Sequence, residues 1–283
     1  MKFFLRNTAG FILASRVPNL TIAIVVQILT AVFLLEQPIQ SAYDLKFILL
    51  IISTIAIGAA GYIINDYYDQ KIDMINRPSK VVVGVLFQRR LAMLSHLSLN
   101  VFAITIGFML HPFVGSVHVF SVIALWYYSN YLRRLPIIGT LTISFLSSLV
   151  VLIVAVFYRE LNQLVVIYAL FAFLTTLIRE MLKDIVDVKG EAAFGCTTVP
   201  VVWGIRAAKN LIFVVLLAGV LLLFYYLFAE ANHAIKLYFL LVSPAFLWFT
   251  YRLQLADTQK QFVWLVNFCS VIIITGILSL LFL

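Results

Sequence analysis

The acidic residues of this sequence gather in two short stretches whose spacing suits metal binding. Seven of the 12 Asp and Glu residues fall within 65–73 and 179–191. Three- and four-residue steps separate Asp66, Asp69 and Asp73 in the first stretch, where Asn65 is also four residues before Asp69, and Glu180, Asp184, Asp187 and Glu191 in the second. If both stretches are helical, each set lies on one face of its helix.

Such faces are unfavourable without a counter-charge. Like charges at this spacing repel by a few tenths of a kcal/mol per pair, and desolvation at a membrane boundary adds to that cost. Mg²⁺ takes oxygen ligands and commonly binds one or two carboxylates together with substrate phosphates. Solvated loop charges are the simpler alternative, but two clusters with the same period at the ends of two apolar stretches favour a divalent-cation site.

Basic residues accompany the acids. Lys71, Arg77 and Lys80 follow the first cluster, and Arg179, Lys183 and Lys189 are interleaved with the second. Arg133 and Arg134 stand in a short polar segment between them. Carboxylates for a metal ion, with Arg and Lys for phosphate oxygens, make a diphosphate site.

The elements that position these residues are predicted to be transmembrane helices. Of 283 residues, 64% are hydrophobic and 11% charged, against about a quarter charged in soluble domains. Nine stretches approach the roughly 20 apolar residues that a spanning helix needs. They are residues 18–35, 46–65, 92–110, 113–130, 136–157, 162–180, 209–229, 235–252 and 262–282. The sequence therefore predicts an all-α integral membrane protein with one membrane domain over residues 1–283.

Two further features refine this picture. The first apolar stretch is long and has no small-residue cleavage pattern after it, so we expect a retained helix, not a signal peptide. Cys196 and Cys269 are far apart and indicate neither a disulfide framework nor a metal cluster. Gly190, Gly195 and Gly204 are expected in loops.

Basic residues predict the orientation. With the N-terminus inside, only Lys46, Arg159 and Lys236 of the 20 Lys and Arg residues fall on the outer side. Such asymmetry is typical of a cytoplasmic N-terminus and places both acidic clusters at the cytoplasmic ends of their helices.

Three motifs resemble those of the UbiA superfamily of intramembrane prenyltransferases. Asn65-Asp66-x-x-Asp69-x-x-x-Asp73 followed by Asn76-Arg77-Pro78 resembles its first aspartate-rich motif. Residues 179–191 resemble its second acidic motif, with Asp187 and Glu191 on the Asp-x-x-x-Asp core. The segment from Tyr128 to Gly139, with Leu132-Arg133-Arg134-Leu135-Pro136, resembles its basic loop. The resemblance covers nearly the whole chain.

The resemblance implies nine transmembrane helices around a central cavity, and Mg²⁺-dependent transfer of a prenyl group from a prenyl diphosphate to a lipid-soluble or amphipathic acceptor. It implies a multi-pass protein of the cell membrane with its active site toward the cytoplasm and no nucleic-acid partner. Residues 179–190 are most similar to the digeranylgeranylglyceryl phosphate synthase branch, which acts on a glyceryl phosphate lipid precursor. Two departures are Ser79-Lys80-Val81 where the family usually has a basic residue and Leu-Pro, and Glu191 where it has Asp.

The implied site residues fall into three groups. Those expected to bind metal are Asn65, Asp66, Asp69, Asp73, Asp184, Asp187 and Glu191. Those expected to be catalytic through that metal are Asp66, Asp69, Asp73 and Asp187. Those expected to bind diphosphate are Arg77, Lys183, Arg133, Arg134 and Tyr128, and the rings of Tyr67, Tyr68 and Tyr128 are candidates to stabilise an allylic cation.

Two alternatives remain at this point. A prenyltransferase for an aromatic acceptor, such as a quinone or porphyrin-type precursor, uses the same chemistry. An ion-coupled transporter also carries carboxylates, but it is expected to hold them near the bilayer midplane on broken helices. Here the acids lie at helix ends, which favours the enzyme.

Overall fold

The computed structural model describes residues 2–229 and 233–282, nearly all of them helical. The long helices are α2 (Val17–Leu29, continued by a π-helical turn over Thr30–Leu34), α3 (Leu45–Asn76), α4 (Arg89–Leu110), α5 (Pro112–Asn130), α6 (Ile138–Tyr158), α7 (Gln163–Ala193), α9 (Gly204–Ala229), α10 (His233–Leu255) and α11 (Gln259–Leu278). The short ones are α1 (Lys2–Ala14), α8 (Val199–Val202) and 3-10 turns at Ile39–Tyr43, Pro78–Lys80, Leu132–Arg134 and Ser279–Phe282. Within the described ranges, β-structure is limited to one isolated bridge between Val83 and Phe87.

Each of the nine predicted apolar stretches coincides with one long helix. Seven segments are long and apolar enough to cross a membrane: Val17–Leu34, Leu45–Asn76, Arg89–Leu110, Ile138–Tyr158, Gln163–Ala193, Gly204–Leu222 and Gln259–Leu281. The main difference is that α3 and α7 do not stop at the end of their apolar runs. They continue to Asn76 and Ala193 and carry the acidic residues on unbroken helix.

Local sequence explains several helix starts. The Asn162 side chain accepts a hydrogen bond from the backbone N–H of Val165 at 2.9 Å and caps α7. His111 caps α5 in the same way, with Pro112 in the first helical turn, where its missing N–H costs nothing. Thr258 and Gln261 form a capping box at the start of α11.

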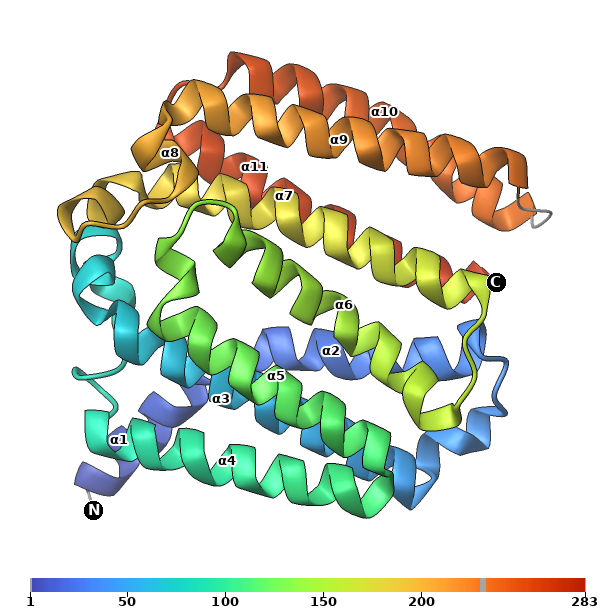
Figure 1. Cartoon of the computed structure of the whole chain (residues 1–283), viewed down its shortest axis with the longest axis horizontal. Helices are drawn as coiled ribbons and strands as arrows, with labels where there is room; N and C mark the ends of the chain where they lie inside the picture. The colour runs from blue at the N-terminus through green and yellow to red at the C-terminus, as the bar shows by residue number, and fades with distance from the viewer. Residues whose placement is uncertain (1, 230–232, 283) are drawn as a thin grey trace.

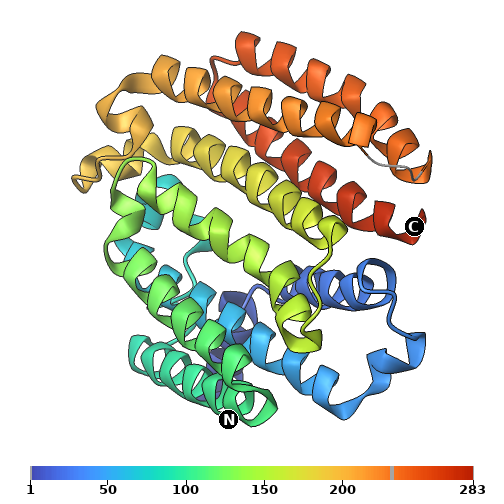
Figure 2. The same ribbon diagram turned by 45° about the vertical axis from the view of Figure 1, so that its right-hand side comes forward.

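The helices follow one another around the bundle, each packed on the next (Figures 1 and 2). Helix α7 lies between α6 and α11, and the α9–α10 pair covers its outer side. A core of buried side chains from α7, α9, α10 and α11 forms one half of the bundle. A second core joins α2, α3, α6 and α7, so α7 belongs to both.

The loops that matter for the site meet at one end of this bundle. The C-terminal ends of α3 and α7, the α5–α6 connection and α8 all lie at the left of Figure 1. Thr197 binds the two loops together there, because its backbone N–H and its hydroxyl both donate to the carbonyl oxygen of Arg134, at 2.7 and 2.9 Å.

One expectation about glycine was wrong. Gly190 is not in a loop but inside α7, because the polar residues around it continue the helix instead of ending it. Gly195 follows α7 with φ +69°, and Gly204 begins α9 with φ +84°, so both have the backbone conformation that favours glycine.

Candidate active site

The acidic residues of α3 lie on one face of its last turns. Asp69 is buried at 4% exposure, and Asn65, Asp66 and Asp73 are partly buried. The helix continues through all four positions, so the three- and four-residue spacing places them in a row, as the sequence predicted.

The acidic residues of α7 are still more enclosed. Glu180, Asp187 and Glu191 are buried, and Asp184 is half-buried. Charged side chains are almost never buried to this extent unless they are paired. These buried negative charges therefore need positively charged partners.

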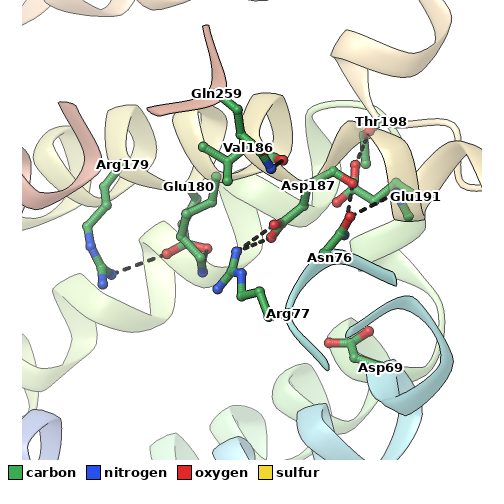
Figure 3. Close-up of polar contacts among 12 residues, drawn as sticks. Asp69, Asn76, Arg77, Arg179, Glu180, Val186, Asp187, Glu191, Thr198 and Gln259 are labelled. Atoms are coloured by element: carbon green, nitrogen blue, oxygen red, sulfur yellow. Dashed lines mark hydrogen bonds and ion pairs between the residues drawn. The ribbon is translucent and has the colours of Figure 1, made fainter. Parts of the chain in front are cut away.

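Arginines from other segments provide most of the balance. Arg77, directly after α3, donates through Nη2 to both carboxylate oxygens of Asp187 on α7, at 2.6 Å to Oδ1 (Figure 3). Arg133, from the α5–α6 connection, is paired with Asp69 and donates to Asn65 Oδ1 at 3.3 Å. These contacts bring all three sequence motifs into one site.

Three more cations complete the arrangement. Arg16, in the turn between α1 and α2, pairs with Asp66 at 2.7 Å. Lys183 Nζ lies 2.6 Å from Glu180 Oε2, a pairing within α7. Arg179 approaches Glu180 at 3.4 Å and also donates to Ser270 on α11 at 3.1 Å. By contrast, Asp73 and Asp184 form no ion pair within the described part of the chain.

The remaining predicted site residues differ in their burial and their contacts. Tyr128 is buried and lies near Glu180, Asp184 and Glu191. Arg134 is exposed, and its backbone carbonyl oxygen accepts both hydrogen bonds from Thr197. The Tyr67 ring is covered by the Arg89 guanidinium, 4.4 Å from the ring centroid. One face of the Tyr67 ring is therefore already in contact with a cation of this chain.

The donor chemistry fits a hard divalent cation. The ligands are carboxylate and amide oxygens, which Mg²⁺ prefers. Seven acidic side chains face five cations (Arg16, Arg77, Arg133, Arg179 and Lys183), so seven minus five leaves two negative charges. No three Asp, Glu, His or Cys groups converge at metal-binding spacing among residues 2–229 and 233–282. The paired arginines keep the carboxylates apart from one another.

Three residues of the site did not stand out in the sequence. They are Arg16, Thr198 and Gln259. Thr198 donates to Glu191 Oε2 at 2.6 Å, and Asn76 and Gln259 bond to the backbone of α7. Asn76 was already part of the first motif, three residues after Asp73. Arg16 and Gln259 are far from the acidic motifs in sequence, and only folding brings them close. Thr198 follows Glu191 by seven residues.

The cysteines take no part in the site. Both Cys196 and Cys269 are buried and free. Burial raises the pKa of the Cys196 thiol, so it stays protonated near neutral pH.

Comparison with known proteins places this site in a family. The sequence model of the UbiA prenyltransferase family matches residues 24–272. Digeranylgeranylglyceryl phosphate synthase of Methanobrevibacter smithii is 30% identical over 257 residues, which are 86% of each chain. The enzyme of that name from Methanothermobacter thermautotrophicus is 33% identical over 168 residues, and that match spans only 59% of each chain.

Solved structures agree on the fold. A structure described as informing on digeranylgeranylglyceryl phosphate synthase in membranes has a TM-score of 0.75 at 20% identity, covering 99% of this chain and 98% of the other. A UbiA homologue from Archaeoglobus fulgidus bound to GPP and Mg²⁺ has a TM-score of 0.65 at 14% identity, covering 96% and 99%. The helices are those of a multi-pass membrane protein, and the chain belongs to the UbiA prenyltransferase family.

Proposed function

We propose that this prenyltransferase moves a geranylgeranyl group from its diphosphate to a glyceryl phosphate lipid precursor, with Mg²⁺ at the two acidic clusters. The names of the two archaeal relatives support the acceptor class. The solved homologue bound to GPP and Mg²⁺ supports the donor class and the metal.

One observation carries the proposal. The acidic faces of α3 and α7 meet at one end of the bundle, joined by Arg77 and Asp187, and Arg133 reaches the same place from a third segment. A diphosphate site needs both carboxylates for metal and guanidinium groups for phosphate oxygens. A transporter would not require both at the ends of apolar helices.

The metal would be held by the residues predicted from the motifs: Asn65, Asp66, Asp69, Asp73, Asp184, Asp187 and Glu191. When bound, Mg²⁺ would supply positive charge to the departing diphosphate. Asp73 and Asp184, which form no ion pair in the described part of the chain, are the carboxylates that give up no partner when the ion enters.

The arginines then exchange partners. Arg77 and Arg133 release Asp187 and Asp69 and turn their guanidinium groups to the diphosphate oxygens. Guanidinium forks fit phosphate and carboxylate equally well, so the exchange keeps each charge paired. Lys183 and Arg134 add positive charge at the same end. Metal and diphosphate accordingly bind together, since each frees the groups that the other needs.

The transfer itself requires no protein nucleophile. The allylic carbon–oxygen bond breaks, the electron pair leaves with the diphosphate, and a hydroxyl oxygen of the acceptor bonds to the carbon and loses its proton. The apolar helices exclude water that would quench the allylic cation. Tyr128, buried beside the acidic cluster, offers a ring face to that cation.

We also propose how the whole chain lies in the membrane. Residues 1–283 form one membrane domain whose nine long helices all span the bilayer around a central cavity. The N-terminus and the acidic ends of α3 and α7 face the cytoplasm, and the protein resides in the cell membrane. The distribution of Lys and Arg supports this orientation.

The test is a transfer assay on purified protein with radiolabelled geranylgeranyl diphosphate and Mg²⁺. Geranylgeranylglyceryl phosphate and a set of aromatic acids are offered as acceptors in parallel. We expect label on the glyceryl phosphate, and at least about 100-fold loss in Asp69→Ala and Asp187→Ala, since losing even a residue behind a metal ligand costs about 10- to 100-fold. Asp257→Ala, an exposed carboxylate paired with Lys209, is the control.

Label on an aromatic acid would instead indicate a prenyltransferase for an aromatic acceptor. Absence of any transfer, together with diphosphate binding that neither substitution alters, would refute the enzyme and favour a transporter.

A further inference from the structure

A neutral side chain at the end of α3 holds the backbone of α7 beside the acidic cluster. Asn76 Nδ2 donates to the carbonyl oxygen of Asp187 at 3.0 Å, and the Gly190 N–H donates to Asn76 Oδ1 at 2.9 Å (Figure 3). One amide thus bonds to two backbone groups of the same helical turn. Neither bond involves a carboxylate.

Because Gly190 has no side chain, the Asn76 amide can lie against α7. A Cβ at this position would be 2.5 Å from Asn76 Nδ2 and 2.7 Å from its Cγ. A real Cβ does not tolerate such contacts, so a side chain at this position would displace the Asn76 amide. The glycine inside α7 therefore has a specific partner, which explains why it stands in a helix that would otherwise favour alanine.

A second amide reaches the same turn from another helix. Gln259, the first residue of α11, donates through Nε2 to the carbonyl oxygen of Val186 at 3.0 Å. The capping box at Thr258 orders the start of α11 and so places Gln259. The turn from Val186 to Gly190 is held by two side-chain amides, Asn76 from α3 and Gln259 from α11.

We propose that Asn76 and Gln259 are positioning residues that fix the α7 turn carrying Asp187 while its carboxylate changes partner. The inference rests on the proposed function, in which Arg77 leaves Asp187 for the diphosphate. When that salt bridge opens, the bonds of Asn76 and Gln259 remain, because their partners are backbone atoms. Asp187 then meets the metal from a backbone that has not moved.

The test uses Asn76→Ala, Gln259→Ala and Gly190→Ala in the full-length protein in detergent. The first measurement is hydrogen exchange of residues 186–193 without metal or substrate. The second is Mn²⁺ affinity, from EPR titration at saturating geranylgeranyl diphosphate without acceptor. Neither measurement depends on turnover. Thermal unfolding of every variant provides a check on the global fold.

We expect exchange in residues 186–193 to become at least about tenfold faster in Asn76→Ala, because the opened turn loses its amide contacts. Mn²⁺ affinity should fall about 10- to 100-fold, the usual effect of losing a support behind a metal ligand. Gly190→Ala should act in the same direction, since its methyl group displaces Asn76. If Asn76→Ala does not fold, the same two measurements on Gln259→Ala test the proposal.

Two variants serve as matched controls. Asn210→Ala removes an exposed asparagine of α9, and Gly219→Ala adds a methyl group whose nearest neighbour is Leu174 at 3.9 Å. Both should behave as wild type in exchange and Mn²⁺ affinity.

Unchanged Mn²⁺ affinity in folded Asn76→Ala and Gln259→Ala would overturn the proposal, and so would equal exchange in residues 186–193. A wild-type protein that binds no Mn²⁺ with the diphosphate would instead refute the proposed function. The two failures are therefore distinguishable.

Discussion

At the scale of single residues, the carboxylates of α3 and α7 meet arginines from elsewhere in the chain. Asp66, Asp69 and Asp187 are each paired, to Arg16, Arg133 and Arg77 respectively. A buried ion pair offsets the cost of desolvation only with good geometry and further hydrogen bonds. The proposed function accounts for keeping charges here, because in it the same groups bind metal and diphosphate when the pairs open.

The contribution of Arg77 is testable by a change that keeps its charge. Arg77→Lys keeps the positive charge but loses the planar guanidinium fork that can contact two phosphate oxygens at once. Hydrogen bonds to charged groups contribute about 1.5–3 kcal/mol, so kcat/KM should fall about 10- to 100-fold, mainly through KM for the prenyl diphosphate. Steady-state kinetics measure this, with exposed Arg90→Lys as control. An unchanged KM would show that Arg77 does not bind the diphosphate.

At the scale of elements, the site depends on where helices continue and where connections turn. The acidic rows exist because α3 and α7 run on beyond their apolar parts. The α5–α6 connection brings Arg133 across to α3, and this connection is tightly packed. A Cβ on Gly139 would lie 2.7 Å from the Leu132 carbonyl oxygen and 2.9 Å from Arg133 Cα, both backbone atoms.

This packing predicts the effect of one added methyl group. In Gly139→Ala the backbone beside it is displaced, which shifts Arg133 away from Asp69. We expect a loss of stability of about 1–3 kcal/mol, as in overpacked cores, with a rise in KM for the diphosphate. Thermal unfolding and kinetics check the two effects. Gly219→Ala, in open surroundings, should change neither, and a Gly139→Ala protein with wild-type KM would contradict the role of the connection.

At the scale of the whole molecule, the proposed orientation puts opposite ends of α3 on opposite sides of the membrane. Ser79 and Gln40 are exposed residues just beyond these two ends, and both native cysteines are buried. In a bacterial inner membrane, a membrane-impermeant maleimide should label Gln40→Cys from outside. It should label Ser79→Cys only after permeabilisation.

Wild-type protein is the control and should remain unlabelled, because its thiols are buried. The reverse pattern, with Ser79→Cys labelled in intact cells, would mean that the acidic ends of α3 and α7 face outward. The positive-inside argument would then be wrong for this chain.

The sequence alone determined the membrane fold class and most of the residues that bear charge at the site. Apolar length marks a spanning helix because lipid cannot satisfy free backbone groups, and every predicted stretch matches a long helix. Asp69 and Asp73 are four residues apart, and so are Asp187 and Glu191. This spacing predicts a shared helical face from neighbouring residues alone. The helix ends were less certain, because Gly190 and the surrounding charges are as common in loops as in helices.

Only the tertiary structure decided which groups face one another. Arg16 and Asp66 are 50 residues apart, and Arg77 and Asp187 are 110 apart, so no local pattern records their pairing. The amide contacts of Asn76 and Gln259 with α7 are equally invisible in sequence, because their partners are backbone atoms that every residue possesses. Packing of α3, α7 and α11 brings them together, and this packing depends on the shapes of side chains along the full length of each helix.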